Sequence, residues 1–338
     1  MCLIFVFVRN LDHVVGGTGT LNSFPYLGVG QIADVRCGDS ASSFAMDGGV
    51  GTRGYGSGGL RVAALGEVRV PGCELVYDEL GTGEPLVLVH GTGAQASTWR
   101  GAVGDLAVGG YRVIAYDRRG YGRSTHRPVR DYRIHVADLA AVIEHVGAPA
   151  HVLGWSSGGN TALALAVEQP ELYRCLVVVE APWHGLRGAT PDLVAILGRA
   201  KFSQLCGRRR NGAAIFFRWV SGLHDGGNGF DRLPAVEQEV LLANYRPVLQ
   251  ELDPHPYGVM MEHIPTKKMA AIRVPITWLL GGETRSEWFR KAHADVVRVT
   301  PSIRTEHITG AGHFAHLDMP TEFAAITLRA MQSCKPHI

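Results

Sequence analysis

The sequence predicts an α/β protein with a mostly parallel central sheet that is flanked by helices. Three observations carry this prediction. Short apolar runs recur between residues 85 and 308, helical stretches separate several of them, and one long interval without a strand signal interrupts the alternation. Parallel strands need crossover connections and are covered on both faces, so they occur as short, nearly continuous apolar runs between helices.

The apolar runs have the length of strands in a buried sheet. They occupy residues 85–90, 112–116, 151–154, 176–179, 276–280 and 303–308. Before them, residues 68–70 and 74–77 alternate apolar and polar positions, which is typical of a hairpin with one exposed face. Helices are predicted between the strands from the apolar spacing of residues 132–146 and from the alanine- and leucine-rich segment 160–168.

The interval without strands predicts a helical cap over residues 184–273. Helical segments such as 191–202 and 233–252 fill it. A long insertion between two strands of a sheet is commonly a functional element that covers a site. The two parts of the core are therefore predicted at residues 66–183 and 274–338.

Residues 1–65 differ in composition from the rest of the chain. Seven of the twelve residues from Gly48 to Gly59 are glycine, and no strand or helix period persists. Such a stretch buries too little apolar surface to offset the entropy of ordering it. The prediction is a disordered glycine-rich N-terminal extension, with an interaction tail as the alternative.

Composition excludes several classes of protein. Of 338 residues, 46% are hydrophobic and 19% charged, and the net charge of +2 favours neither a nucleic acid nor an anionic membrane as partner. The six cysteines are scattered without a CxxC pair, which argues against a disulfide framework or a zinc site. This cysteine usage predicts a reducing, cytoplasmic location. The residues indicate neither metal nor cofactor and leave the oligomeric state open.

A serine follows one of the predicted strands in the pattern glycine-x-serine-x-glycine. Gly154, Ser156 and Gly158 occupy the pattern, after the strand at residues 151–153 and before a helix. A serine at a sharp strand-to-helix turn exposes its Oγ over the positive end of the helix, and the glycines allow close packing. Ser156 is therefore the predicted nucleophile, and the backbone N–H of Ser157 is predicted to serve an oxyanion.

Two further loops complete the predicted chemistry. Thr92 lies in a His-Gly-Thr-Gly segment after the strand at 85–90, and its backbone N–H is predicted as the second oxyanion donor. His90 is expected to have a structural role. His313 lies on a loop between small residues, after Ser156 in chain order, and is the predicted general base. His316 is expected to pack or to contact the ligand.

These motifs resemble the α/β-hydrolase superfamily. The resemblance rests on the His-Gly-Thr-Gly loop, the segment Tyr116–Ser124, the serine turn and the terminal Gly-x-Gly-His, in that order, and it spans residues 68–335. It implies the α/β-hydrolase fold with a helical cap, a serine nucleophile and no cofactor. It also makes Asp117 and the glycines that follow it a structural turn.

The acid of the site departs from the common pattern of this superfamily. Most relatives carry an aspartate on the loop that here occupies residues 281–286, and this loop contains none. Glu283 lies one or two positions before the place where most relatives carry this aspartate. Glu180 ends an apolar strand, where some relatives, including many haloalkane dehalogenases, place their acid. A glutamate there is costly to bury unless it is paired. Glu180 is therefore the favoured partner of His313, with Glu283 as the alternative.

The predicted function is hydrolysis of a carboxylic ester or lactone of a small molecule through an acyl-enzyme intermediate. A carbon–carbon bond hydrolase and a non-catalytic small-molecule receptor remain alternatives. The serine at position 156 argues against dehalogenases and epoxide hydrolases, which use an aspartate nucleophile. Trp155, Trp183 and Phe314 flank catalytic segments and are predicted to line the acyl site, with His184 as a weaker candidate.

Overall fold

The computed structural model describes residues 64–124, 129, 131–253 and 263–334. All of them belong to one compact unit that covers residues 57–338, and the unit formed by residues 1–56 lies outside the described residues. The predicted extension over residues 1–65 is therefore outside the described part of the chain, except for its last two residues.

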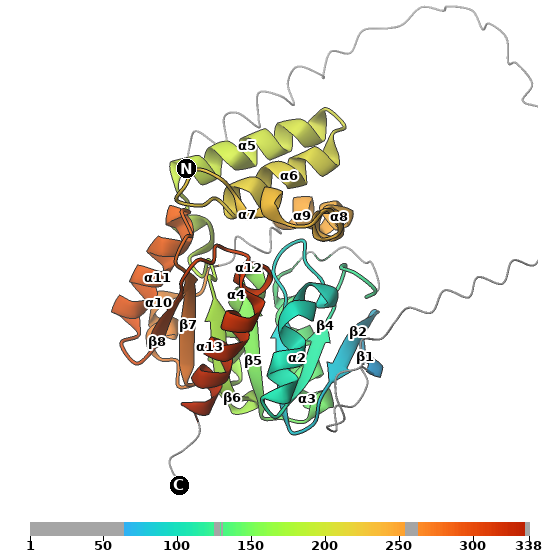
Figure 1. Ribbon diagram of the computed structural model, residues 1–338, viewed down its shortest axis with the longest axis vertical. Helices are drawn as coiled ribbons and strands as arrows, with labels where there is room; N and C mark the ends of the chain where they lie inside the picture. The colour runs from blue at the N-terminus through green and yellow to red at the C-terminus, as the bar shows by residue number, and fades with distance from the viewer. Residues whose placement is uncertain (1–63, 125–128, 130, 254–262, 335–338) are drawn as a thin grey trace, which may run out of the picture. The chain divides into compact units, whose positions relative to one another are not determined.

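Eight strands form one sheet in the order β1-β2-β4-β3-β5-β6-β7-β8 (Figure 1). The hairpin of β1 and β2 is antiparallel, β2 pairs antiparallel with β4, and every other pair is parallel. The predicted hairpin and the mostly parallel sheet are confirmed. The strands are β1 (Ala64–Val70), β2 (Cys73–Leu80), β3 (Glu84–Val89), β4 (Tyr111–Tyr116), β5 (Ala150–Trp155), β6 (Tyr173–Val179), β7 (Ile276–Gly281) and β8 (Arg304–Ile308).

Helices cover both faces of the sheet. They are α2 (Arg100–Val108), α3 (Arg133–Val146), α4 (Ser157–Glu168), α10 (Thr266–Ala270), α11 (Glu287–Val299), α12 (Ala315–Asp318) and α13 (Pro320–Gln332). Two of these helices were not predicted. The two glycines of α2 weaken its apolar pattern, whereas α11 places Trp288, Phe289 and Ala292 on one buried face. Among the described residues, no helix is both long and apolar enough to cross a bilayer.

The core has two parts because neighbouring residues of a strand point to opposite faces of the sheet. Leu153 of β5 packs with residues of α2 and α13, whereas Val152 packs with residues of α3 and α4. Every residue of β5 and of β7 is buried. Burial on both faces explains why these strands read as continuous apolar runs.

Helices α5 to α9 lie above one end of the strands in Figure 1, and we call them the α5–α9 layer. They are α5 (Pro191–Leu205), α6 (Arg209–Val220), α7 (Gly229–Arg232), α8 (Ala235–Ala243) and α9 (Tyr245–Glu251). The segment predicted as helical over 233–252 is two helices, which meet at Asn244. Pro247 stands in the first turn of α9, where its missing N–H disrupts no helical hydrogen bond.

Helix α10 does not join this layer, although the predicted cap range of 184–273 includes it. Met269 of α10 is buried in the same part of the core as Val152, and its carbonyl accepts a 2.9 Å hydrogen bond from Thr300 Oγ1. The helical insertion is therefore shorter at its C-terminal side than predicted.

One pair of cysteines corrects the expectation from cysteine spacing. Cys175 in β6 and Cys334 after α13 form a disulfide with a Cα–Cα distance of 6.0 Å. The two residues are 159 positions apart, and only the packing of α13 beside β6 brings them together. Disulfides persist mainly in oxidising compartments, so this pair does not support the predicted reducing location.

Candidate active site

Ser156 occupies the turn between β5 and α4, as predicted. Its backbone has φ 55° and ψ −124°, a conformation that costs energy for a residue with a side chain. Its N–H donates a 2.8 Å hydrogen bond to the Val179 carbonyl. A Cβ on Gly158 would lie 2.3 Å from the Val89 carbonyl oxygen, so only glycine permits this close approach to β3. Strained backbone held in this way is characteristic of functional sites.

Glu180 and His313 meet beside this turn. His313 Nδ1 lies 2.7 Å from Glu180 Oε2, and both side chains are buried. The other carboxylate oxygen, Oε1, accepts hydrogen bonds from the Gly281 N–H at 2.8 Å and from Thr284 Oγ1 at 2.6 Å. Glu180 also has a positive φ of 46°, which only Ser156 shares among the described residues other than glycine. This full set of partners stabilises a carboxylate that would otherwise be costly to bury.

Glu283, the alternative acid, occupies a different position. Its backbone N–H donates to the Ala311 carbonyl and its carbonyl accepts from the His224 N–H. Within the described residues, no hydrogen bond or ion pair joins its carboxylate to His313. Thr284, the next residue, is the member of this loop that reaches Glu180.

The loop of His313 is attached to the serine turn. The indole N–H of Trp155 donates a 2.8 Å hydrogen bond to the His313 carbonyl, and the two rings are 5.3 Å apart. Phe289 of α11 stacks on the imidazole at 4.2 Å. Because the Glu180 carboxylate accepts from Nδ1–H, the tautomer that it favours leaves Nε2 free to accept a proton. Tautomer and ring orientation therefore suit a general base.

The loop with the predicted oxyanion donor runs along the serine turn. A Cβ on Gly91 would lie 2.9 Å from the Ser156 Cβ. Thr92 Oγ1 lies 2.9 Å from Ser157 Oγ, so the two predicted donor residues are in contact. Ser157 is the first residue of α4, and a backbone N–H at this position has no partner within the helix.

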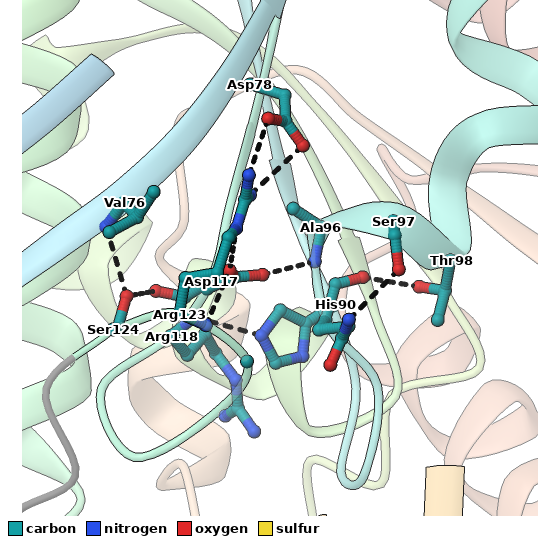
Figure 2. Close-up of polar contacts among 12 residues, drawn as sticks. Val76, Asp78, His90, Ala96, Ser97, Thr98, Asp117, Arg118, Arg123 and Ser124 are labelled. Carbon is teal, nitrogen blue, oxygen red and sulfur yellow. Dashed lines mark hydrogen bonds and ion pairs between the residues drawn. The ribbon is translucent and has the colours of Figure 1, made fainter. Parts of the chain in front are cut away.

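His90 and Asp117 have structural roles, as expected (Figure 2). His90 Nδ1 donates to the Gly91 carbonyl at 2.8 Å, and Nε2 accepts from the Arg118 N–H at 2.9 Å. Burial, together with the charge of Arg118, holds the pKa of His90 well below its ordinary value. Asp117 accepts from the Ala96 N–H at 2.6 Å and from Arg123 Nε at 2.7 Å, which ties the loop after β3 to the turn after β4.

The predicted lining residues divide between two places. Trp155 and Phe314 lie at the junction of the serine and histidine loops, with ring centroids 5.6 Å apart. Trp183 does not join them. Its indole belongs to the same part of the core as Val152 and donates a 2.9 Å hydrogen bond to the Ala292 carbonyl of α11. His184 binds Asp295 of α11 at 2.9 Å instead of reaching the serine turn.

His316 packs against two tryptophan rings, and its burial predicts a pH-dependent contribution to stability. Its ring lies 4.5 Å from those of Trp99 and Trp155, and neither nitrogen has a hydrogen-bond partner in the described chain. Burial and the neighbouring His313 lower the pKa of His316 to about 3. Between pH 6.5 and 3, His316 is therefore protonated in the unfolded chain but stays neutral in the folded chain. The folded state thus loses stability as the pH falls.

We expect His316→Phe to flatten this dependence. The variant should lose about 1.4 kcal/mol less unfolding free energy per pH unit than the wild type between pH 6 and pH 4. Urea unfolding at several pH values measures the two slopes. Buried His90 and His135 are present in both proteins, so the difference between the two slopes reports chiefly on His316. Parallel curves for the two proteins would contradict the buried, uncharged state of this histidine.

Several residues of the site could not be identified from local sequence patterns. Thr284 contacts Glu180, and Phe289 contacts the His313 ring. Arg118 and Glu251 form a buried ion pair beside Thr92. Glu251 is more than 130 residues from Arg118, and no local pattern pairs them. In the described ranges, no group of three histidine, cysteine or acidic side chains is arranged to hold a metal ion.

Several known proteins are similar to this chain in sequence. The chain is 35% identical over 118 residues to a pimeloyl-acyl-carrier-protein methyl ester esterase of Aeromonas salmonicida, a match that covers 34% of this chain and 45% of the esterase. It is 26% identical over 261 residues to the sn-1-specific diacylglycerol lipase ABHD11 of Xenopus laevis, covering 73% and 80% of the two chains. The match to the esterase thus spans less than half of that relative's length.

A solved structure and a family profile agree on the fold. Carboxylesterase CesB of Bacillus subtilis superposes with a TM-score of 0.67 at 19% identity, over 81% of this chain and 93% of that one. At this identity the likeness shows the fold alone, which is the predicted α/β-hydrolase fold. Residues 86–326 match the profile of the alpha/beta hydrolase family, which is more than two thirds of the chain. The chain therefore belongs to the alpha/beta hydrolase family.

Proposed function

We propose that the protein is a serine hydrolase that cleaves a carboxylic ester or lactone of a small molecule, without a cofactor. The observation that carries the proposal is the 2.7 Å contact of His313 Nδ1 with the buried Glu180 carboxylate, beside a serine held in a strained turn. Nucleophile, base and orienting acid are the three parts that activate a serine. The esterase and lipase among the relatives favour the same reaction class.

In this mechanism His313 Nε2 takes the proton of Ser156 Oγ as the oxygen attacks the acyl carbon. The backbone N–H groups of Thr92 and Ser157 stabilise the oxyanion that forms. Glu180 stabilises the imidazolium, which then protonates the leaving alcohol. Water, deprotonated by the same histidine, attacks the acyl-enzyme, and the collapse of the second oxyanion releases the acid and restores Ser156.

The surroundings of the site suit a small-molecule substrate. Trp155 and Phe314 are the proposed acyl-site residues, and the α5–α9 layer is the proposed cap. Phe217 of α6 and Val248 of α9 lie within 3.0 Å of the place that a Cβ on Gly93 would occupy, so this layer packs directly on the oxyanion loop. A cytoplasmic location, and the absence of nucleic-acid and membrane partners, stay predictions from composition.

A phosphonate probe with a fluoride leaving group tests the proposal together with a short-chain nitrophenyl ester. We expect the full chain to hydrolyse the ester and to be labelled on the tryptic peptide that contains Ser156. Labelling without ester turnover would favour the carbon–carbon bond hydrolase as the reaction class. A well-folded protein that shows neither labelling nor turnover would contradict the hydrolase and favour a receptor.

A further inference from the structure

A buried chain of polar groups connects the two oxyanion residues to helix α9. Ser157 Oγ lies 2.9 Å from Thr92 Oγ1, which lies 2.6 Å from Glu251 Oε2. The second oxygen of Glu251, Oε1, lies 2.8 Å from Arg118 Nη2. A carboxylate only accepts hydrogen bonds, so Thr92 uses its single hydroxyl proton toward Glu251 and accepts from Ser157. The chain of bonds therefore runs in one direction, from α4 to α9.

Burial makes this arrangement costly to break. The side chain of Arg118 is 0% exposed and that of Glu251 is 4% exposed. A buried carboxylate without a partner is expensive, and removal of one member of a buried pair leaves the other unpaired. Arg118 directly follows Asp117 in the turn after β4, so the pair joins the core of the sheet to the last turn of α9.

Helix α9 holds the oxyanion loop at a second point. Asn244, which precedes α9, donates from Nδ2 to the Gly93 carbonyl at 3.0 Å. Gly93 has φ +83°, and a Cβ there would lie 2.3 Å from the Phe217 ring. Two consecutive residues, Thr92 and Gly93, thus have their positions set by groups at the two ends of one helix.

We propose that Glu251 is a positioning residue for the oxyanion site and acts through the Thr92 hydroxyl. This inference rests on the proposed serine-hydrolase function. An oxyanion donor is effective only when it is preorganised at the place where charge develops, and small displacements cost large factors in rate. The contact of α9 with the core is then a requirement for full catalysis as well as for stability.

Glu251→Gln in the full chain tests the proposal, with Glu237→Gln as the matched control. Glu237 of α8 pairs with Arg100 of α2 at 2.8 Å, a second ion pair between the α5–α9 layer and the core. We expect Glu251→Gln to lower kcat for a nitrophenyl ester by about 10- to 100-fold, with KM changed by less than about twofold. A boronic acid that mimics the tetrahedral intermediate should lose affinity by a similar factor. Glu237→Gln should change neither value.

A double-mutant cycle with Thr92→Val shows whether Glu251 acts through the hydroxyl. Valine keeps the backbone N–H and the shape of threonine but removes the link. We expect a comparable loss of kcat, and little further loss when Glu251→Gln is added. If Glu251→Gln fails to fold, Thr92→Val carries the same test through kcat and boronate affinity.

The outcomes separate this inference from the proposed function. Wild-type protein that shows neither phosphonate labelling nor ester turnover overturns both. Given turnover, an unchanged kcat and boronate affinity in folded Glu251→Gln overturns only the positioning role. Equal losses in Glu237→Gln would assign the effect to docking of the layer as a whole, and additive losses in the double variant would show that Glu251 does not act through Thr92.

Discussion

Ser156→Ala should lower kcat/KM for ester hydrolysis by at least about 1,000-fold, which corresponds to about 4 kcal/mol of transition-state stabilisation. The nucleophile forms the covalent bond on which both halves of the reaction depend, and no other described hydroxyl occupies a comparable strained turn. Alanine removes one atom and introduces no clash. The folded state should therefore persist, and a positive φ should remain costly for alanine as it is for serine.

Steady-state hydrolysis of a nitrophenyl ester, with active sites counted by the phosphonate probe, measures this effect. Ser333→Ala, on the surface after α13, is the control and should retain wild-type activity and labelling. Retention of more than about a tenth of the activity by Ser156→Ala would rule out the acyl-enzyme mechanism. Loss of labelling alone, with turnover kept, would place the nucleophile elsewhere.

Glu180→Gln should have the second largest effect, a loss of about 1,000- to 10,000-fold in kcat. The glutamine amide keeps the shape of the side chain but offers an N–H group to His313 Nδ1. The imidazole must then accept at Nδ1 and carry its proton on Nε2, so it can no longer take the proton of Ser156. The variant also lacks the negative charge that stabilises the imidazolium.

Glu283→Gln is the matched control for this prediction, because it makes the same chemical change on the loop that usually carries the acid. It should retain activity close to that of the wild type, since no described contact joins its carboxylate to His313. Rates of ester hydrolysis across pH 5 to 9, with unfolding curves for all three proteins, separate catalysis from stability. A large loss in Glu283→Gln with activity kept in Glu180→Gln would reverse the assignment of the acid.

Local sequence predicted those parts of the site that depend on short segments. Ser156 was identifiable because glycines two positions before and after it are required for the close approach to β3 and α4. His313 and Thr92 lie in short segments rich in small residues after predicted strands, at the edge of a parallel sheet where strand ends converge. The sheet itself follows from apolar runs that reflect burial on both faces.

Residues brought together by packing alone escaped prediction or stayed ambiguous. Trp183 follows Glu180 by only three residues, yet its indole enters the opposite part of the core, so nearness in sequence to the acid was misleading. The pair of Arg118 and Glu251 depends on the docking of α9 over the turn after β4. Neither residue lies in a local sequence pattern from which the other could be identified as its partner.

By itself, the sequence determined the α/β class, the hairpin, the serine turn and the loop of the histidine, because hydrophobic period and glycine spacing are local properties. It left two candidates for the acid, since Glu180 and Glu283 both follow apolar strands. Only the tertiary structure decided which carboxylate meets His313. The neighbouring strands β6 and β7 place the Gly281 N–H and the Thr284 hydroxyl on Glu180, and these donors stabilise its buried charge facing the imidazole.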